Sequence, residues 1–309
     1  MTQQLIPPTR PLEAGLYLVA TPIGHLEDIT LRALRILRDV DQIAAEDTRT
    51  ARKLLNAYDL QKPTFSLYRD NEAQRVPRLI EHLQEGQSVA LISEAGMPGI
   101  SDPGYVAVQH VLEAGFPVIP IPGANAVTTA LLPSGLPCDR FMFLGFLPPK
   151  SGKRRQHLAP YLHVPSTLVL YASPHKLPSL LEDLENILGD RRACIARELT
   201  KSHEEFCRGT LSELAAQFAD ESRRKGEFVL LIEGHQGPVE TVLESEQQET
   251  EEARIKARIR TLLKEGVRPS KLARKLTAEF PSLSRKRAYQ QILALEKHDE
   301  DGQKESEES

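Results

Sequence analysis

Short apolar runs alternate with amphipathic segments along the first 135 residues. The run Leu16–Ala20 is typical of a strand that is buried on both faces. From Leu31 to Val40 the apolar side chains recur at helical spacing instead. The two patterns repeat and predict strands over 42–45, 88–93 and 117–121, and helices over 48–55, 76–83, 105–114 and from 124 onward. Such alternation predicts a parallel sheet with helices on both faces.

Polar residues that can cap helices stand before several of these helical segments. Asp28 or Thr30 precedes the first helix, and Thr48 or Thr50 opens the second. Asp70 precedes the third. Their side-chain oxygens can accept hydrogen bonds from the free N–H groups of a first helical turn. The helices are therefore expected to begin close to the carboxyl ends of the strands.

Four loops rich in glycine, proline or acidic residues follow the predicted strands, at 20–30, 45–49, 93–104 and 120–126. One such loop alone favours an ordinary turn, in which glycine and proline serve backbone geometry. Four loops at one edge of one sheet favour a ligand site, because ligands bind beyond the carboxyl ends of parallel strands. Glycine in these turns lets a ligand approach the backbone closely.

The chain changes character after Gly135, where prolines become frequent and a hinge is expected near 133–137. A second α/β region follows, with strands near 167–171, 194–197 and 228–233 and helices near 175–188 and 211–218. The predicted organisation is a disordered N-terminus (1–14), an N-terminal α/β domain (15–134), a second α/β domain (135–237), an acidic linker (238–250), a basic helical segment (251–297) and a disordered acidic tail (298–309).

Charge is nearly balanced overall but unevenly placed. The chain has 39 Lys and Arg against 43 Asp and Glu, which argues against a uniformly basic coat for nucleic acid. Residues 251–297 nevertheless hold 13 basic and five acidic residues. This segment is either a second RNA contact or a solvated helical appendage. A compact basic group beside the hinge favours phosphate contacts over plain solvated surface, and consists of Lys150, Lys153, Arg154 and Arg155.

Several common site types are missing from the sequence. It has no dinucleotide-binding G-x-G-x-x-G, no P-loop, no H-E-x-x-H and no G-x-S-x-G. The three cysteines, Cys138, Cys194 and Cys207, are widely spaced, which suits reduced thiols in a cytosol and predicts neither a disulfide framework nor a metal site. No apolar run approaches roughly 18 residues and no signal peptide is visible, so a cytoplasmic protein without a membrane span is expected.

Together, the four loops resemble those of the class III, tetrapyrrole-methylase-like enzymes that use S-adenosylmethionine (SAM). The resemblance runs from about Gly15 to Gly234 and includes the segments 70–72, 146–150, 171–176, 197–201 and 225–227. It implies a two-domain α/β fold, here with a small helical C-terminal extension, a SAM cleft between the domains, and a homodimer. Within the family, the loops are similar to those of members that act on small-subunit ribosomal RNA. This implies 2′-O-methylation of a cytidine ribose in the decoding region of 16S rRNA, with rRNA or the 30S subunit as partner.

The resemblance also implies which residues contact SAM. They lie in three of the loops and on the facing strands of the second domain, at Pro22, Ile23, Gly24, Glu94, Gly96, Met97, Gly123, Ala124, Asn125, Ala126, Tyr171, Ala172, Ala196 and Val229. Three positions depart from the family pattern: Glu94 and Met97 stand where Asp and Thr are usual, and Ala172 where Glu is common. The departures concern the fine geometry of the cleft and not the fold.

Methyl transfer to a hydroxyl demands orientation more than special residue types, because the sulfonium already activates the methyl group. A base that removes the hydroxyl proton adds a smaller contribution. Glu46 and Asp47 are the candidate catalytic acids, since they end a predicted strand. Their alternative role is to cap the next helix or to pair with Arg49 and Arg52.

Two other functions remain open at this point. The first is a methyltransferase of the same fold that acts on a small molecule such as a tetrapyrrole, although the basic segments argue against a compact neutral substrate. The second is a ribosome-binding protein whose catalysis is impaired, for which the departures at Glu94 and Met97 are the reason. SAM titration separates the second from an active enzyme.

Overall fold

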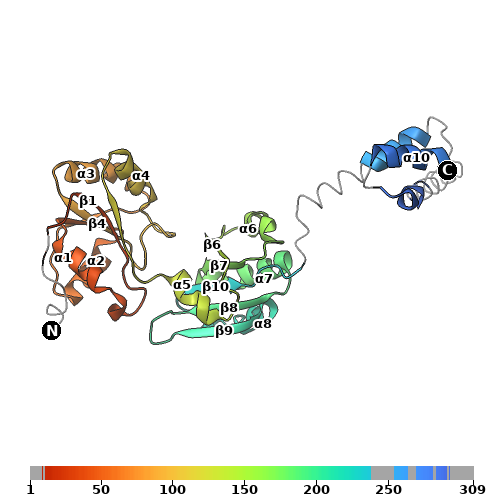
Figure 1. Ribbon diagram of the computed structural model, residues 1–309. Helices are drawn as coiled ribbons and strands as arrows, with labels where there is room; N and C mark the ends of the chain where they lie inside the picture. The colour runs from red at the N-terminus through yellow and green to blue at the C-terminus, as the bar shows by residue number, and fades with distance from the viewer. Residues whose placement is uncertain are drawn as a thin grey trace. The chain divides into compact units, whose positions relative to one another are not determined.

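Two five-stranded sheets form most of the folded chain (Figure 1). The computed structural model describes residues 9, 11–237, 254–263, 269–280, 283–290 and 292. The chain divides into two compact units, 1–236 and 237–309, and both sheets belong to the first.

The first sheet is entirely parallel, with strand order β3-β2-β4-β1-β5. Its strands are β1 (Gly15–Val19), β2 (Gln42–Ala45), β3 (Thr64–Ser66), β4 (Ser88–Ile92) and β5 (Val118–Ile121). Helices α1 (Leu31–Asp39) and α2 (Thr48–Ala57) pack on one face, and α3 (Glu72–Gln84) and α4 (Tyr105–Glu113) on the other (Figure 1). The predicted parallel sheet with helices on both faces is confirmed.

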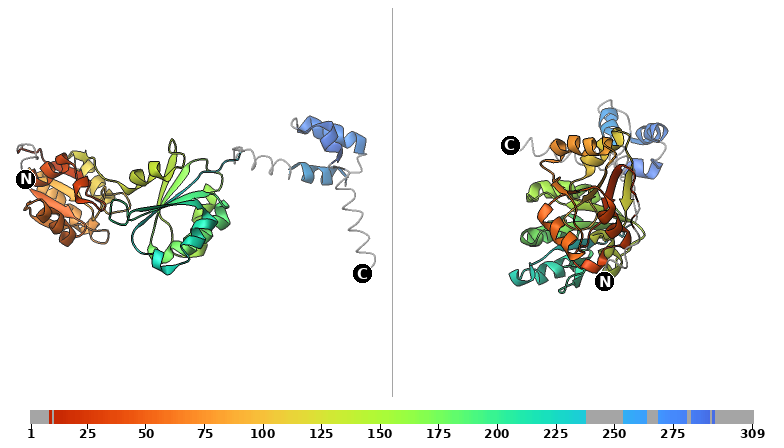
Figure 2. Two further views of the ribbon diagram at one scale, coloured as in Figure 1. Left: turned by 90° about the horizontal axis from the view of Figure 1, so that it is seen from below. Right: turned by 90° about the vertical axis from the view of Figure 1, so that its left-hand side faces the viewer.

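The second sheet is mixed, with order β6-β7-β10-β8-β9. The hydrogen-bonded pair β6–β7 is parallel, and the other three pairs are antiparallel. Its strands are β6 (Phe141–Phe146), β7 (Thr167–Ala172), β8 (Arg192–Arg197), β9 (Glu205–Thr210) and β10 (Phe228–Ile232). Helices α6 (Ser151–Leu158), α7 (Leu177–Leu188) and α8 (Leu211–Gln217) cover one face, which the left view of Figure 2 shows in green and teal. The short helix α5 (Ala126–Leu131) packs on the other face.

An apolar cluster shared by both halves holds the first sheet's loops against the second sheet. Ile23, from the loop after β1, packs in this cluster with Leu199 and Val229. The backbone N–H of His25 donates to Thr200 Oγ1 at 3.0 Å and ties the same loop to the 199–201 segment. The loops at the carboxyl end of the first sheet therefore face the second sheet.

Several local predictions differ from the structure. The sequence reading missed β3, β6 and β9. β3 has only three residues and β9 is an edge strand without a continuous apolar run, whereas β6 has an apolar run but lies in the proline-rich stretch after the expected hinge. The third helix begins at Glu72 after Asn71, so the predicted cap at Asp70 is wrong. The fifth helix begins at Ala126 and not at Ala124, because the Asn125 side chain accepts hydrogen bonds from the N–H groups of Val127 and Thr128.

The second unit has a small core of its own. Residues 254–263, α10 (Pro269–Glu279) and residues 285–290 are helical. Apolar side chains from all three segments form one cluster that includes Ile259, Leu276 and Ala288. The predicted linker 238–250 and tail 298–309 lie outside the described residues, as does nearly all of 1–10. In the part of the chain that is described, no helix combines the length and the apolar character needed to span a membrane.

Candidate functional site

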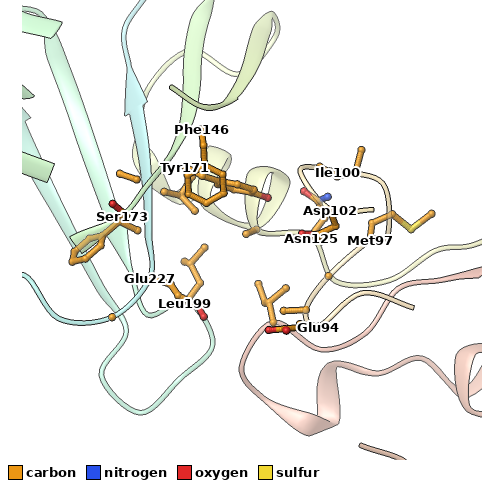
Figure 3. Close-up of a pocket in the computed structure, with 18 of the residues that line it drawn as sticks. Glu94, Met97, Ile100, Asp102, Asn125, Phe146, Tyr171, Ser173, Leu199 and Glu227 are labelled. Carbon is orange, nitrogen blue, oxygen red and sulfur yellow. The ribbon is translucent and has the colours of Figure 1, made fainter. Parts of the chain in front are cut away.

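A pocket of about 460 Å³ lies between the carboxyl end of the first sheet and the second sheet (Figure 3). One wall comes from the loops after β2, β4 and β5 and includes Glu46, Glu94, Met97, Asp102 and Asn125. The facing wall comes from the second half of the chain, namely Phe146, Tyr171, Ala172, Ser173, Pro174, Leu199 and 226–229. The volume is in the range of small-molecule sites, and apolar and aromatic side chains supply much of the lining.

Backbone pairing holds the loops after β1 and β4 together. Thr21 and Gly96 exchange two backbone hydrogen bonds, of 2.9 and 3.1 Å. Gly96 has φ = +78°, a left-handed conformation that glycine adopts without strain. A Cβ added there would lie 3.4 Å from the Ile23 side chain. This close approach leaves the pocket wall at Gly96 as bare backbone.

Buried polar contacts fix the outer loops of the pocket. The Glu72 carboxylate, which is 6% exposed, accepts hydrogen bonds from the N–H groups of Gly104 (3.0 Å) and Ala107 (2.9 Å) and so anchors the start of α4. Glu198 Oε1 accepts from the N–H of Glu227 at 2.9 Å and from Lys201 Nζ at 2.9 Å. The segments 70–72, 197–201 and 225–227 therefore support the pocket walls.

Backbone strain gathers around the pocket. Among the described residues, four non-glycine residues have positive φ: Asp59, Ser101, Glu198 and Thr200. Ser101 lies between two lining residues, and Glu198 and Thr200 flank the lining residue Leu199. Such conformations cost about 1–3 kcal/mol each and persist where the surrounding structure holds them. Three of the four strained positions thus serve to shape this pocket.

The pocket is acidic. Four carboxylates line it (Glu46, Glu94, Asp102 and Glu227), while none of the described lining residues is Lys, Arg or His. Burial, reinforced by the neighbouring Glu46 and Glu94, raises the pKa of Asp102 to about 6, against smaller lowering effects of Ser93 and Arg69. Burial also raises the pKa of Glu46, which accepts a hydrogen bond from the Glu94 N–H at 3.3 Å. The site therefore favours a cation, whose charge would relieve the repulsion among the acids.

Tyr171 closes the pocket opposite Asp102 (Figure 3). Its ring packs between Phe143 and Phe146, with centroid distances of 4.9 and 5.4 Å. Burial and the nearby Asp102 raise the pKa of Tyr171 to about 12, so its hydroxyl stays protonated and can donate a hydrogen bond. An aromatic wall beside acids suits a ligand with both a flat apolar part and a positive charge.

Nine of the fourteen predicted contact residues line this pocket. They are Ile23, Glu94, Gly96, Met97, Asn125, Ala126, Tyr171, Ala172 and Val229. Pro22 and Gly24 line an adjacent cavity instead. A Cβ at Gly123 would lie 2.8 Å from Ala20 Cβ, so that glycine serves close packing, while Ala124 packs in the shared apolar cluster and Ala196 is fully buried. These five residues do not line the pocket, and their contact with SAM stays a prediction.

The two candidate catalytic acids separate. Glu46 lines the pocket, but Asp47 does not. Asp47 caps α2 by accepting from the Arg49 N–H at 2.7 Å and pairs with the Arg49 guanidinium at 2.7 Å. Hydrogen bonds from Arg49 hold the pKa of Asp47 at about 2. Asp47 thus has the structural role that the sequence left open as the alternative.

Three members of the basic group beside the hinge lie on helix α6 and not in a loop, and Lys150 stands at its N-cap. Lys150 and Lys153 are exposed, but Arg154 is only 2% exposed and its Nε donates to Asp183 at 2.7 Å. Arg155 is half-exposed and donates to the same carboxylate at 2.6 Å. The predicted phosphate contact is therefore wrong for Arg154, because its guanidinium is buried and paired with Asp183.

Sequence reasoning did not assign Asp102, Phe146, Ser173, Leu199 or 226–228 to the site, although all of them line it. All except Phe228 fall in a segment that carries the family resemblance, and that position was the available signal. Whether such a segment lines a pocket or supports it depends on contacts between distant parts of the chain, which motif matching alone does not show.

Comparison of the sequence with known proteins shows the family of this chain. Residues 15–215 match the family described as Tetrapyrrole (Corrin/Porphyrin) Methylases. A protein of Synechocystis sp. named "Ribosomal RNA small subunit methyltransferase I" is 45% identical over 282 residues, covering 91% of this chain and 98% of that protein. Proteins of the same name from Halalkalibacterium halodurans (53% over 225 residues, 73% and 78% covered) and Escherichia coli O157:H7 (48% over 230 residues, 74% and 80% covered) are also similar. The chain belongs to the tetrapyrrole methylase family, in its ribosomal RNA small subunit methyltransferase I group.

Solved structures of low sequence identity show the same fold. A diphthine synthase superposes with a TM-score of 0.56 at 19% identity, covering 71% of this chain and 89% of that chain. A uroporphyrin-III C-methyltransferase from Thermus thermophilus, complexed with S-adenyl homocysteine, gives a TM-score of 0.51 at 21% identity, covering 70% and 96%. At these identities the likeness concerns the fold of the family and not its substrates.

Proposed function

We propose that this protein transfers the methyl group of SAM to the ribose 2′-oxygen of a cytidine in the decoding region of 16S ribosomal RNA. Membership of the ribosomal RNA small subunit methyltransferase I group supports methyl transfer to small-subunit rRNA. The observation that supports SAM most directly is the acidic pocket, in which four carboxylates face aromatic and aliphatic walls.

The pocket residues fit SAM in charge and shape. SAM combines a sulfonium and an ammonium with one carboxylate, and its net positive charge suits a pocket without lining cations. Its adenine is flat and apolar and suits the walls formed by Phe146, Tyr171 and Leu199. Asp102 and Glu46 are placed to stabilise the positive end, and the backbone around Gly96 offers hydrogen bonds at close range.

In the proposed reaction the ribose oxygen bonds to the methyl carbon while the carbon–sulfur bond breaks and its electron pair stays on sulfur. SAM supplies an already activated methyl group, so the protein mainly holds the oxygen in line with it. The hydroxyl proton leaves to a base. Glu46 is the proposed acceptor, because it lines the pocket and its raised pKa makes its carboxylate a stronger base than an exposed glutamate.

The direct test uses small ribosomal subunits, and rRNA extracted from them, from cells that lack the gene. The purified protein and methyl-labelled SAM should label the 16S rRNA at one cytidine, identified by nuclease resistance at the 2′-O-methyl position. Labelling of a base, or of no RNA at all, would contradict the proposal. If no RNA is labelled, calorimetric titration with SAM identifies the reason. A protein with impaired catalysis that only binds ribosomes would bind no SAM.

SAM affinity should rise with pH through about 6, the pKa of Asp102. At pH 5 only about a tenth of that carboxyl would be ionised, so SAM should bind about 10-fold more weakly than at pH 7.5. The charged groups around Asp102 are Glu46, Glu94 and Arg69, with Tyr171 opposite it. Calorimetry at a series of pH values measures the effect.

The Asp102→Asn variant is the control for this pH dependence and should bind SAM almost equally at both pH values, apart from a smaller contribution of Glu46. The unliganded protein should show the matching change in stability. The pKa of Asp102 is higher in the native protein than in the unfolded chain. The wild type should therefore lose stability as the pH rises from about 4 to about 6, and the variant should lose less. A wild-type affinity that does not change with pH would refute this assignment.

RNA would contact the protein outside the acidic pocket. Lys150, at the N-cap of α6, and Lys153, on α6, remain proposed phosphate contacts, since both are exposed. The helical segments of the second unit also expose cations, among them Arg260, Lys275 and Lys286. These side chains support the role of the basic segment as a second RNA contact.

We also propose a homodimer that forms through the edge of the second sheet. Strand β6 is an edge strand, and its side chains Phe141 and Met142 are 42% and 37% exposed. Leu132, at the start of the 3-10 helix Leu132–Ser134 that precedes β6 in the chain, is 75% exposed. Exposed apolar side chains on an edge strand favour association with a second chain. Light scattering should give the dimer mass for the wild type and a lower mass for a Phe141→Asp, Met142→Asp variant.

A further inference from the structure

A second cavity of about 330 Å³ adjoins the acidic pocket. It lies over the end of β4, between the loop after β1 and helix α2. Ile23, Glu94 and Ala95 line both cavities. A single layer of residues therefore separates the two spaces, and Glu94 reaches both.

This arrangement matters because methyl transfer requires two ligands in contact. The attacking oxygen and the methyl carbon must come within roughly 3–3.5 Å of each other. A nucleotide whose ribose reacts with a ligand of the acidic pocket must therefore sit in a space that adjoins that pocket. Of the cavities found in the described residues, the one beside α2 shares lining residues with the acidic pocket.

The walls of the second cavity suit a single nucleoside. Ile23, Leu26 and Leu54 offer apolar surface for a base, and Leu26 is 48% exposed at the rim. The hydroxyl of Thr50 offers a hydrogen bond for base or ribose. Enzymes that modify one nucleotide commonly take it out of the stack into such a pocket. RNA loops supply unstacked nucleotides at low cost.

The charge of helix α2 suits the flanking phosphates. The helix carries Arg49, Arg52 and Lys53 and no acidic residue. Lys53 lines the cavity, and Arg52 precedes it on the exposed surface. Neither Arg52 nor Lys53 has an ion-pair partner within the described part of the chain, whereas Arg49 pairs with Asp47. Two uncompensated cations beside a cavity of nucleoside size are available for phosphate oxygens.

We propose that this second cavity, bounded by the 21–24 loop and α2, holds the target nucleotide of a single-stranded RNA segment, and that Lys53 and Arg52 bind its flanking phosphates. The inference rests on the proposed function, because it places the RNA substrate of that reaction. The ribose of this nucleotide then lies beside Glu94, between the base in the second cavity and the methyl donor in the acidic pocket.

The test compares three variants of the full chain in methyl transfer to small ribosomal subunits from cells lacking the gene. Thr50→Phe fills the cavity and should raise the KM for the subunits at least about 10-fold, because a displaced nucleotide no longer reaches the methyl group. Lys53→Gln should raise the same KM and reduce the salt-dependence slope of RNA binding by about 1. Lys62→Gln removes the same charge at the amino end of β3 and should change neither quantity.

SAM affinity, measured by calorimetry, should stay within about twofold of wild type in all three variants, since a nucleotide site differs from the SAM site. If the wild type is active and the KM for the subunits is unchanged in both Thr50→Phe and Lys53→Gln, the cavity assignment is overturned. The proposed function would then remain intact. Loss of SAM binding in Thr50→Phe, with a normal circular dichroism spectrum, would also overturn it. A wild type that methylates no RNA would overturn both proposals.

Discussion

Replacing Gly96 by valine is expected to weaken SAM binding at least about 100-fold, or about 2.7 kcal/mol. Gly96 has φ = +78°, a conformation that costs a residue with a side chain about 1–2 kcal/mol. The added Cβ would lie 3.4 Å from the Ile23 side chain, and the two valine methyl groups would extend into the pocket wall. Strain and lost space act together, and calorimetric titration measures their sum.

Gly99→Val is the matched control. Gly99 lies in the same loop with φ = +83°, does not line the pocket, and an added Cβ there would meet no atom within 4 Å. It should destabilise the protein about as much as Gly96→Val but leave SAM affinity unchanged. Gly96→Ala should fall between, since it adds the backbone strain without the branched methyl groups. Equal affinities for Gly96→Val and wild type would show that SAM binds elsewhere.

The central part of the fold could be predicted because its strands are buried on both faces. Leu16 and Val19 in β1, like every residue of β4, are buried, and such strands appear as plain apolar runs. An apolar run alone was not enough for β6. Its residues Phe141–Phe146 are almost all apolar, but they stand between Pro137 and Pro148, and prolines are typical of connecting segments.

The site could be predicted where it depends on local backbone geometry and not where it depends on distant partners. Gly96 is recognisable because a turn with positive φ favours glycine. The raised pKa of Asp102 results from burial against Glu46 and Glu94, which arrive from other loops. Arg154 and Lys153 look alike in the sequence, but only Arg154 meets Asp183, 29 residues later in the chain. Charge alone therefore cannot separate a buried anchor from an RNA contact.

Asp183→Ala is expected to lower the free energy of unfolding of the first unit by about 3–5 kcal/mol. Asp183 is 2% exposed and accepts hydrogen bonds from Arg154 Nε (2.7 Å), Arg155 Nε (2.6 Å) and Ser151 Oγ (2.9 Å). Removing the carboxylate would leave the Arg154 guanidinium buried without its counter-charge. It would also weaken the attachment of α6 to α7, because these contacts join the two helices. Urea unfolding at pH 7 measures the loss.

Glu182→Ala is the matched control, since Glu182 is the exposed neighbour of Asp183 on α7, and it should change the unfolding free energy by less than about 0.5 kcal/mol. The effect of Asp183 should also depend on pH in a defined direction. Burial raises its pKa, but hydrogen bonds from Arg155, Ser151 and Arg154 outweigh that effect and hold the pKa below the usual value. Its stabilising contribution is therefore complete above the unfolded pKa of about 3.9 and disappears as the pH falls through the native pKa. A deficit in Asp183→Ala that is as large well below pH 3 as at pH 7 would mean that packing, and not the ion pair, holds α6 to α7.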